Sequence, residues 1–424
     1  MNAGRWAGRW GERKHEAVRM EKEPRDKPFR VVLGFGTRPE AIKLAPVYLE
    51  LAATPGIEPF ILVTGQHQEQ LDQALAVFGI EAWANLRVMT DRQRLPELVM
   101  RILPEAARHL RELEADYVLV QGDTLSTFAI AWAAFLERIP VGHVEAGLRT
   151  GLIEEPFPEE ANRRLTAVVA DLHFAPTPLA RANLMEEGID QQRILVTGQT
   201  GVDALLHAVG KGRLPPGLPP GPYATVTLHR RENWPRLRHL AAIVRLVARA
   251  HPTRTFVFPM HRNPLIRQEV VPELEGVPNV VLIDPLDYGE MAALLYRSEV
   301  ILTDSGGLQE EGVTLGVPVV VLRQTTERPE GVESGALTLA GFDPARVVAA
   351  VSAALETPAA SPTSLSANPD GDGRASTRVA RGVAWRLGVG QRPRNWRRVA
   401  GLKVMAGRDP SMDKTVGQTA RPSR

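Results

Sequence analysis

The chain has 424 residues, a formal net charge of +2, a pI of about 9.0 and no cysteine. This length allows two domains with a core in each, and the lack of cysteine excludes disulfides, thiolate metal sites and cysteine nucleophiles. Residues 1–30 and 374–424 carry +4 and +11, so the body between them carries −13. The basic pI therefore belongs to the ends, and we expect no nucleic-acid partner. No apolar run approaches the length of a membrane span, so we expect no membrane partner and a reducing, cytoplasmic location.

Two series of short apolar segments alternate with helical-looking segments along the body. The first series consists of residues 30–35, 58–64, 117–121, 139–144, 171–175 and 193–198, with helices predicted over 40–51 and 96–113. The second consists of residues 223–228, 254–259, 279–284, 299–304 and 317–322, with helices predicted over 238–249 and 288–296. Strands that alternate with helices indicate parallel sheets, so the sequence predicts an α/β fold of two Rossmann-like doubly wound domains facing a central cleft.

The composition also predicts where these domains begin and end. The Pro/Gly-rich stretch 210–222 reads as a linker, and the long basic ends lack periodicity. We expect the following division: 1–28, a disordered basic extension; 29–209, the first domain; 210–222, the linker; 223–356, the second domain; 357–387, a linker and a possible last helix that packs back on the first domain; 388–424, a disordered basic tail.

The stretch Val31–Lys43 combines a strand, a Gly-containing turn and a helix start. A helix start attracts phosphate through its free N–H groups, and Arg38 and Lys43 would add cationic donors. A well-capped structural helix explains Thr37, Pro39 and Glu40 equally well but leaves Arg38 and Lys43 unexplained. Pro39 replaces the third glycine of the dinucleotide fingerprint, and no P-loop pattern occurs, so we expect no nicotinamide cofactor.

A second possible anion site lies in the stretch 300–312, where Ser305, Gly306 and Gly307 open a helix. Glu310 and Glu311 follow too late to serve only as a helix cap, and Glu311 could accept hydrogen bonds from ribose hydroxyls. Two anion sites facing one cleft favour a ligand that contains a diphosphate, such as a nucleotide sugar.

Charged residues crowd the stretch 141–164, where a short buried strand runs into a loop that contains two prolines. Together, five charged or titratable residues favour a functional site over a purely structural role at a helix start: His143, Glu145, Arg149, Glu159 and Arg163. For Glu160 alone we accept the plainer interpretation, an exposed acid in the first helical turn.

Two further strand ends carry candidate residues. His229 ends a strand among arginines, where a phosphate-binding or acid role and a purely structural role are about equally favoured. Asp123 follows another strand, and taken alone it would be an ordinary helix cap. The histidines show no HExxH motif or paired spacing, so we expect no metal site.

In their order, these motifs resemble the bacterial non-hydrolysing UDP-N-acetylglucosamine 2-epimerases. The similarity covers about Arg30 to Gly373 and includes GTRPEAIK, GQHQEQ, QGDT, VGHVEAGLRT, PFPEEANRR, TGQTGVDAL, HRREN, PMHRNP, DSGGLQEE, TERPEG and NPDGDG. The resemblance implies a homodimer with the two-domain architecture of B-type glycosyltransferases. It also implies reversible conversion of UDP-N-acetylglucosamine (UDP-GlcNAc) into UDP-N-acetylmannosamine (UDP-ManNAc) for cell-surface polysaccharide, by elimination of UDP to a glycal and its re-addition.

The resemblance assigns roles to individual positions. Asp123, Glu145, Glu159 and His229 match catalytic residues, without deciding which carboxylate is the base. Residues that match substrate contacts are Arg38, Lys43, Arg163, Ser305, Gly306, Gly307 and Glu311. Gln66, His67 and His261 match positions that bind a second UDP-GlcNAc as an activator, although Gln70 stands where the pattern has Met. A hydrolysing epimerase, a glycosyltransferase and a sensor without turnover are the competing interpretations.

Overall fold

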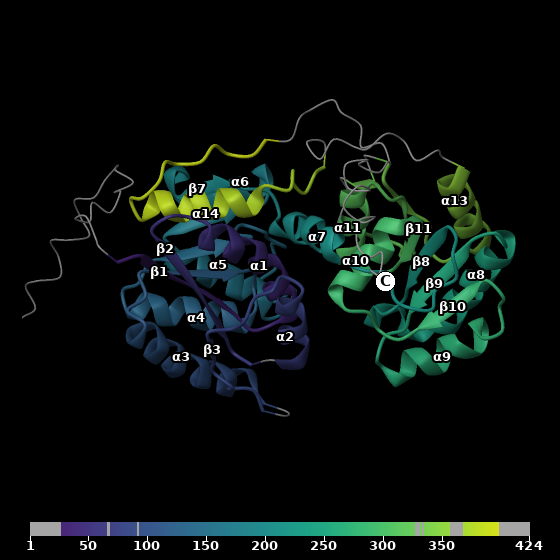
Figure 1. Ribbon diagram of the computed structural model, residues 1–424, viewed down its shortest axis with the longest axis horizontal. Helices are drawn as coiled ribbons and strands as arrows, with labels where there is room; N and C mark the ends of the chain where they lie inside the picture. Colours follow the sequence, from purple (N-terminus) through teal and green to yellow (C-terminus); the bar gives the residue numbers. More distant parts are fainter. Residues whose placement is uncertain are drawn as a thin grey trace, which may run out of the picture.

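The computed structural model describes residues 27–65, 68–90, 93–326, 331–332, 335–356 and 368–397. It forms two lobes, each built on one parallel sheet (Figure 1). The expected basic extension up to residue 26, the linker residues 357–367 and the tail from residue 398 lie outside the described residues. In the described part of the chain, no helix combines the length and apolar character needed to cross a bilayer.

The first lobe contains a seven-stranded sheet in the order β3-β2-β1-β4-β5-β6-β7. Its strands are β1 (Phe29–Phe35), β2 (Ile57–Val63), β3 (Ala84–Asn85), β4 (Tyr117–Gln121), β5 (Val141–Val144), β6 (Leu172–Ala175) and β7 (Ile194–Val196). Its helices are α1 (Arg38–Ala52), α2 (Gln68–Ala76), α3 (Leu95–Glu112), α4 (Leu125–Leu136), α5 (Glu159–Val169), α6 (Pro178–Glu186) and α7 (Thr200–Lys211), with a 3-10 turn η1 (Gln191–Arg193).

The second lobe contains a six-stranded sheet in the order β10-β9-β8-β11-β12-β13. Its strands are β8 (Tyr223–Thr227), β9 (Thr255–Pro259), β10 (Val280–Ile283), β11 (Ser298–Thr303), β12 (Val319–Val321) and β13 (Leu337–Leu339). Its helices are α8 (Leu237–Ala250), α9 (Pro264–Leu274), α10 (Tyr288–Arg297), α11 (Gly306–Leu315) and α13 (Pro344–Glu356), with a 3-10 turn η2 (Arg231–Arg236).

The strand order confirms the predicted fold class of two doubly wound α/β lobes. In each sheet the order reverses between two neighbouring strands, β1 and β4 in the first lobe and β8 and β11 in the second. Ligands of such sheets bind beyond the carboxyl ends of the strands at this reversal. The segments that follow these four strands carry Arg38, the first residue of α1, and the loop residues Asp123, His229 and Ser305. The topology alone therefore brings residues from distant parts of the chain to two facing sheet edges.

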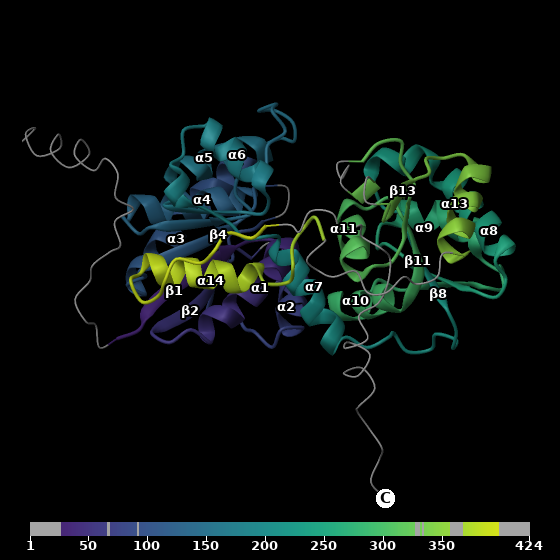
Figure 2. The same ribbon diagram turned by 90° about the horizontal axis from the view of Figure 1, so that it is seen from above.

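The last helix, α14 (Ala375–Arg386), returns to the first lobe, where it lies beside α1 (Figure 2). Gly382 of α14 approaches the sheet so closely that an added Cβ would lie 2.6 Å from Phe174. The buried Asp203 of α7 accepts hydrogen bonds from the N–H groups of Ala375 and Ser376 and so caps α14 from outside. Helix α7 lies between the lobes and contacts α1 on one side and α10 on the other.

The predicted disorder of residues 388–424 is wrong for residues 388–397. Trp396 is buried, and its N–H donates to the carbonyl of Val196 at 2.7 Å. The Asn395 side chain accepts from the N–H of Val196 at 2.9 Å. Strand β7 is the edge of the first sheet, so its unpaired backbone groups bind this segment. The sequence contains no periodic signal for this interaction because a single edge contact has no repeat.

Candidate active site

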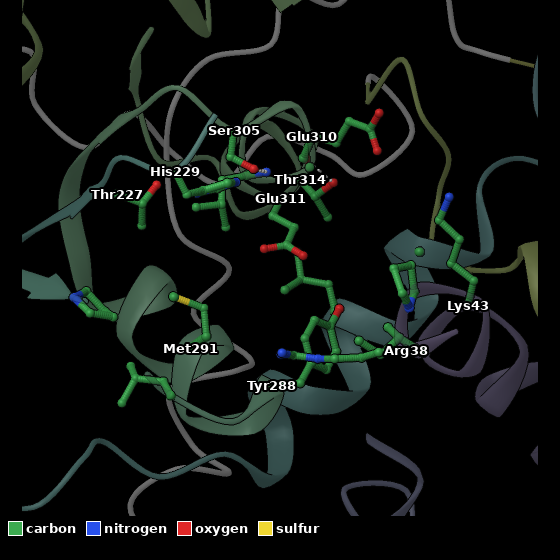
Figure 3. A pocket seen from close by; sticks show the side chains of 18 of the residues that line it. Arg38, Lys43, Thr227, His229, Tyr288, Met291, Ser305, Glu310, Glu311 and Thr314 are labelled. Carbon is green, nitrogen blue, oxygen red and sulfur yellow. Dashed lines mark hydrogen bonds between the residues drawn. The ribbon is translucent and has the colours of Figure 1, made fainter. Parts of the chain in front are cut away.

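A cavity of about 640 Å³ lies between the two lobes, beyond the carboxyl ends of the strands. The first lobe contributes Arg38, Lys43 and Glu145 to its wall, and the second contributes His229, Ser305, Gly307 and Glu311. Figure 3 shows Lys43 and Arg38 on one side and Ser305, His229 and Glu311 on the other. The two predicted anion sites therefore do face one cleft.

The start of α1 is fixed by Glu40, which is buried. Its Oε2 accepts hydrogen bonds from the N–H groups of Gly36 and Thr37, and its Oε1 accepts from the hydroxyls of Thr124 and Thr127. The well-capped helix start expected from Thr37 and Glu40 is observed as a capping box, and the Glu40 carboxylate also ties α1 to the start of α4. Arg38 and Lys43 consequently project from a helix whose first turn is rigidly anchored.

Lys43 is paired with Glu145, the residue that follows strand β5. Its Nζ lies 2.5 Å from Glu145 Oε2, and the side-chain amide of Gln121 donates to the same oxygen at 2.9 Å. Burial disfavours the charged form of Lys43, but the carboxylates of Glu145, Glu310 and Asp123 outweigh it and raise the pKa of Lys43 above its usual value. Glu145 itself has a left-handed backbone with φ of 64°. Such conformations are costly for a residue with a side chain and are concentrated at functional sites.

Asp123 lies at the end of β4 and is held by Arg163 of α5. The Nε and Nη2 atoms of Arg163 donate to Asp123 Oδ2 at 2.9 and 2.5 Å. Arg163 also donates to Glu160 at 3.1 Å, so its guanidinium joins two carboxylates. Neither Asp123, Glu159 nor Arg163 is among the residues that line the cavity in the described part of the chain.

The interpretation of Glu160 as an exposed helix acid is wrong, because its side chain is fully buried. It accepts from Thr150 N–H, Arg163 and Arg164, and these donors hold its pKa below the usual range although burial opposes ionisation. Arg149 pairs with Glu187 at 2.7 Å, in a contact that requires no ligand. Sequence alone cannot show which of the adjacent residues Glu159 and Glu160 is buried. The rotation of the helix about its own axis decides which of the two side chains points inward.

On the second lobe, the start of α11 forms a cradle of small residues. Ser305 is the N-cap, with its hydroxyl oxygen 3.5 Å from the N–H of Leu308. Gly306 is buried, and Gly307 is exposed in the cavity wall, where an added Cβ would meet no atom within 4 Å. Free N–H groups at a helix start suit an anionic group of a ligand.

Glu311 lies one helical turn further along α11. Burial, together with the neighbouring Glu310, raises its pKa to about 8, although Arg38 acts in the opposite direction. Figure 3 shows Arg38 reaching from the first lobe towards Tyr288 and the side of the cavity that carries Glu311. Glu311 is therefore largely protonated at neutral pH, and its carboxyl group can both donate and accept hydrogen bonds.

His229 follows β8 and faces two neighbours. Its ring stacks on that of His261 with centroids 6.1 Å apart, and its Nδ1 lies 3.8 Å from Asp304. Burial lowers the pKa of His229, while Asp304 opposes the shift. Asp304 is fully buried and accepts hydrogen bonds from the backbone N–H groups of His229 and Arg230 and from Asn233. Sequence reasoning missed Asp304 and Gln121, which both stand directly at strand ends, the position that could have identified them.

Of the residues predicted to bind an activator, His261 lines the cavity, whereas Gln66 and His67 lie outside the described residues. Four residues of the TERPEG motif, 327–330, also lie outside them. Within the described ranges, no group of three or more potential ligands is placed to hold a metal ion.

Comparison with known proteins supplies the family. Residues 49–384 match the family model described as UDP-N-acetylglucosamine 2-epimerase. The chain belongs to this family. The UDP-N-acetylglucosamine 2-epimerases of Bacillus subtilis and Escherichia coli K12 are each 43% identical to it, over 85% and 83% of this chain and 97% of each relative.

Solved structures of the family have the same two-lobed fold. A crystal structure of UDP-GlcNAc 2-epimerase from Neisseria meningitidis bound to UDP-GlcNAc is 39% identical with a TM-score of 0.72, covering 84% of this chain and 99% of that one. The enzyme from Methanocaldococcus jannaschii in complex with UDP-GlcNAc and UDP is 32% identical with a TM-score of 0.65, covering 84% and 100%. These matches confirm the family predicted from the ordered motifs and the architecture of the B-type glycosyltransferases.

Proposed function

We propose that the chain interconverts UDP-GlcNAc and UDP-ManNAc without hydrolysis, and so supplies N-acetylmannosamine units for cell-surface polysaccharide. One observation carries the proposal: a helix start suited to a diphosphate faces a lysine–carboxylate pair across a single cavity. Members of the family have been crystallised with UDP-GlcNAc and with UDP, ligands whose diphosphate suits this cavity. The cavity volume of about 640 Å³ falls within the usual range for small-molecule sites.

The chemistry requires that C2 of the sugar lose its proton although no carbonyl group is adjacent. In the proposed reaction a carboxylate removes the C2 proton, the C1–O bond breaks, and UDP leaves with the bonding electrons, so that a C1–C2 double bond forms. UDP then adds back to C1 while a proton reaches the other face of C2. Atoms and charge balance without an oxidant, so no cofactor is needed.

The described residues can supply the groups that this reaction needs. Glu145, Asp123 and Glu159 are the candidate proton-transfer groups, and the neutral ring of His229 is placed beside the diphosphate cradle. Arg38, Lys43 and the start of α11 would stabilise the negative charge that grows on the departing UDP. Arg163, the remaining predicted substrate contact, donates hydrogen bonds to Asp123 and Glu160, so it would also hold a candidate proton-transfer group in place.

One experiment separates this proposal from its competitors. The protein is incubated with UDP-GlcNAc in D₂O, and the products are followed by NMR. UDP-ManNAc with deuterium at C2 supports the proposal. Free N-acetylmannosamine would indicate a hydrolysing epimerase, transfer that depends on an acceptor would indicate a glycosyltransferase, and no change would indicate a binding protein.

We further infer that the lobes close over the substrate. Asp123 and Glu159 lie outside the cavity lining and belong to the first lobe, so movement of the lobes towards each other would bring them closer to a sugar whose diphosphate is held at α11 of the second lobe. Solution scattering with and without UDP tests this inference: closure predicts a smaller radius of gyration with UDP, and identical profiles would contradict it.

An activating site for UDP-GlcNAc also belongs to the proposal. His261 stacks on His229, so a ligand that contacts His261 would act directly on a residue of the reaction site. Initial rates with UDP-ManNAc should rise when traces of UDP-GlcNAc are added. An unchanged rate would rule out activation.

We infer a homodimer from an exposed apolar surface on two neighbouring helices. Trp132, Phe135 and Leu136 of α4 and Leu165 and Val168 of α5 are all exposed, and α4 contacts α5. Val168→Glu should produce monomers in analytical ultracentrifugation, whereas Leu179→Glu on the separate helix α6 should not. Monomeric unmodified protein would contradict the inference.

A further inference from the structure

Three side chains fix the position of Asp123 from different directions. His143 Nε2 lies 2.7 Å from the carbonyl oxygen of Gly122, and the side-chain amide of Asn162 donates to the carbonyl of Asp123 at 2.9 Å. Arg163 holds the carboxylate. Because a peptide unit is planar, a bond to the Gly122 carbonyl also sets the direction of the Asp123 N–H. Both peptide units that flank Asp123 are therefore anchored by side chains.

The Gly122 peptide is the point where this anchoring matters most. Gly122 has φ of 73°, in the left-handed region, and an added Cβ would meet no atom within 4 Å. Glycine rotates more freely than any other residue, so the peptide between Gly122 and Asp123 has little restraint of its own. The hydrogen bond from His143 supplies that restraint on the side of the loop that faces the sheet.

His143 lies on β5 and is fully buried, so its ring is shielded from water. Burial lowers its pKa to about 4, and the ring is neutral at physiological pH. A carbonyl oxygen can only accept, so Nε2 carries the hydrogen and Nδ1 does not. Nδ1 has no hydrogen-bond partner among the described residues, which leaves the bond to Gly122 as the one polar contact of the ring within that part of the chain.

A neighbouring histidine provides a natural control. His173 pairs with His143 in register across β5 and β6 and is equally buried. Neither of its ring nitrogens has a hydrogen-bond partner within the described ranges. The two residues thus share chemistry and burial but differ in whether the ring holds the loop that carries Asp123.

We propose that His143 is a positioning residue that orients Asp123 through its hydrogen bond to the Gly122 carbonyl. The inference rests on the proposed role of Asp123 in proton transfer. Loss of the bond lets the Gly122 peptide rotate and displaces the Asp123 backbone, while the diphosphate cradle on the other lobe is untouched. Catalysis should therefore suffer more than substrate binding.

The test compares three variants of the full-length protein. His143→Phe keeps the ring shape and removes the donor, and His143→Gln retains an N–H donor near the position of Nε2. In His173→Phe, an equally buried ring is replaced away from the loop. We expect His143→Phe to lower kcat for UDP-GlcNAc by ~10- to 100-fold, the cost of a misplaced catalytic group, with KM and UDP affinity changed by about twofold at most. His143→Gln should recover most of the loss, and His173→Phe should keep kcat within about twofold.

The rate of deuterium uptake at C2 should follow kcat across the three variants, and circular dichroism and UDP titration show whether each one is folded. Equal losses in His143→Phe and His173→Phe, or no recovery in His143→Gln, would reduce His143 to a packing residue and overturn the proposal. If Asp123→Asn turns over slowly while His143→Phe is normal, the positioning role alone fails. Normal turnover in Asp123→Asn would overturn the proposed role of Asp123 and the positioning role with it.

Discussion

The two walls of the cavity are built in different ways. On the first lobe, Lys43 and Glu145 of the wall are paired with each other, and Asp123, which lies outside the cavity lining, is paired with Arg163. On the second lobe the wall at α11 is made of Ser305 and Gly307, and an added Cβ on Gly307 would meet no atom within 4 Å. Lys43 and Glu145 of the first wall are held in place by their ion pair. The second wall has small residues at α11, which leave space for a ligand. Substitutions on the first wall should therefore affect rate and stability, and those on the second should affect affinity.

The largest expected effect is the loss of turnover when one of the candidate proton-transfer carboxylates of the first lobe is neutralised. Glu145→Gln and Asp123→Asn should each lower kcat by ~10²-fold or more, the usual scale for general acid–base groups. Epimerisation of UDP-GlcNAc followed by NMR measures the effect, and Glu112→Gln, at an exposed ion pair of α3, is the control. Near-normal turnover in both variants would contradict the expectation that substitutions on the first lobe lower the rate.

The buried ring of His143 should make the stability of the first lobe depend on pH. The pKa of His143 is about 4 in the folded chain and about 6.5 when unfolded, so the unfolded state takes up the proton first as pH falls. The stability of the folded chain that depends on a neutral His143 ring is therefore fully present above pH 6.5. It is lost as the pH falls from 6.5 to 4. The free energy of unfolding should fall by about 2 kcal/mol between pH 7 and pH 5 on this account.

Urea unfolding of the unmodified protein and of His143→Gln at both pH values measures this contribution, because groups that do not interact with His143 titrate alike in both proteins. The variant should lose less stability than the unmodified protein. Equal losses would show that the ring does not titrate between the two states.

The buried carboxylate of Glu160 should contribute to stability without touching the ligand. Glu160→Gln weakens its hydrogen bonds to Arg163 and Arg164, which should cost about 1.5 kcal/mol, the lower end for bonds to charged groups. Thermal unfolding measures the loss, with the exposed Glu154→Gln as the matched control. A Glu160→Gln protein as stable as the control would mean that the carboxylate is not needed to hold α5.

The smallest expected effect belongs to the second wall. Gly307→Val places a side chain in the cavity, and its Cβ meets no atom of the folded chain within 4 Å. UDP affinity should therefore fall by about tenfold or more while stability is kept, with tenfold equal to about 1.4 kcal/mol. Titration calorimetry with UDP measures the affinity. Gly210→Ala, where an added Cβ also meets no atom but lies away from the cavity, should bind UDP normally. Full affinity in Gly307→Val would show that this wall is not filled by the ligand.

Much of the fold could be predicted from sequence because the periodic signals are long. The predicted helix at 238–249 is observed as Leu237–Ala250, and that at 288–296 as Tyr288–Arg297. Strand β3 was missed because two residues are too few for a pattern to form. Strand β13 was missed because its sequence LTL lacks the unbroken apolar run of the equally short β7 and β12. The contact of residues 395 and 396 with β7 links positions about 200 residues apart, which no local pattern records.

The candidate site was predictable to the extent that it lies at strand ends. Arg38, Glu145, His229 and Ser305 were found there, and the cavity brings them together. What could not be predicted is which charges are already paired, since the partnership of Asp123 with Arg163 depends on how α5 rests on the sheet. For the same reason Glu160 was taken as exposed although the fold buries it.

Because α14 packs on the first lobe, the core of that lobe is completed only late in the synthesis of the chain. Phe174 and Leu195 of the first sheet pack against Gly382, a residue made only after the entire second lobe. On the ribosome the first lobe therefore begins folding first but closes its core last. A truncation before Ala375 would remove no cavity residue, yet it would leave the lobe that carries Glu145 with an open hydrophobic face.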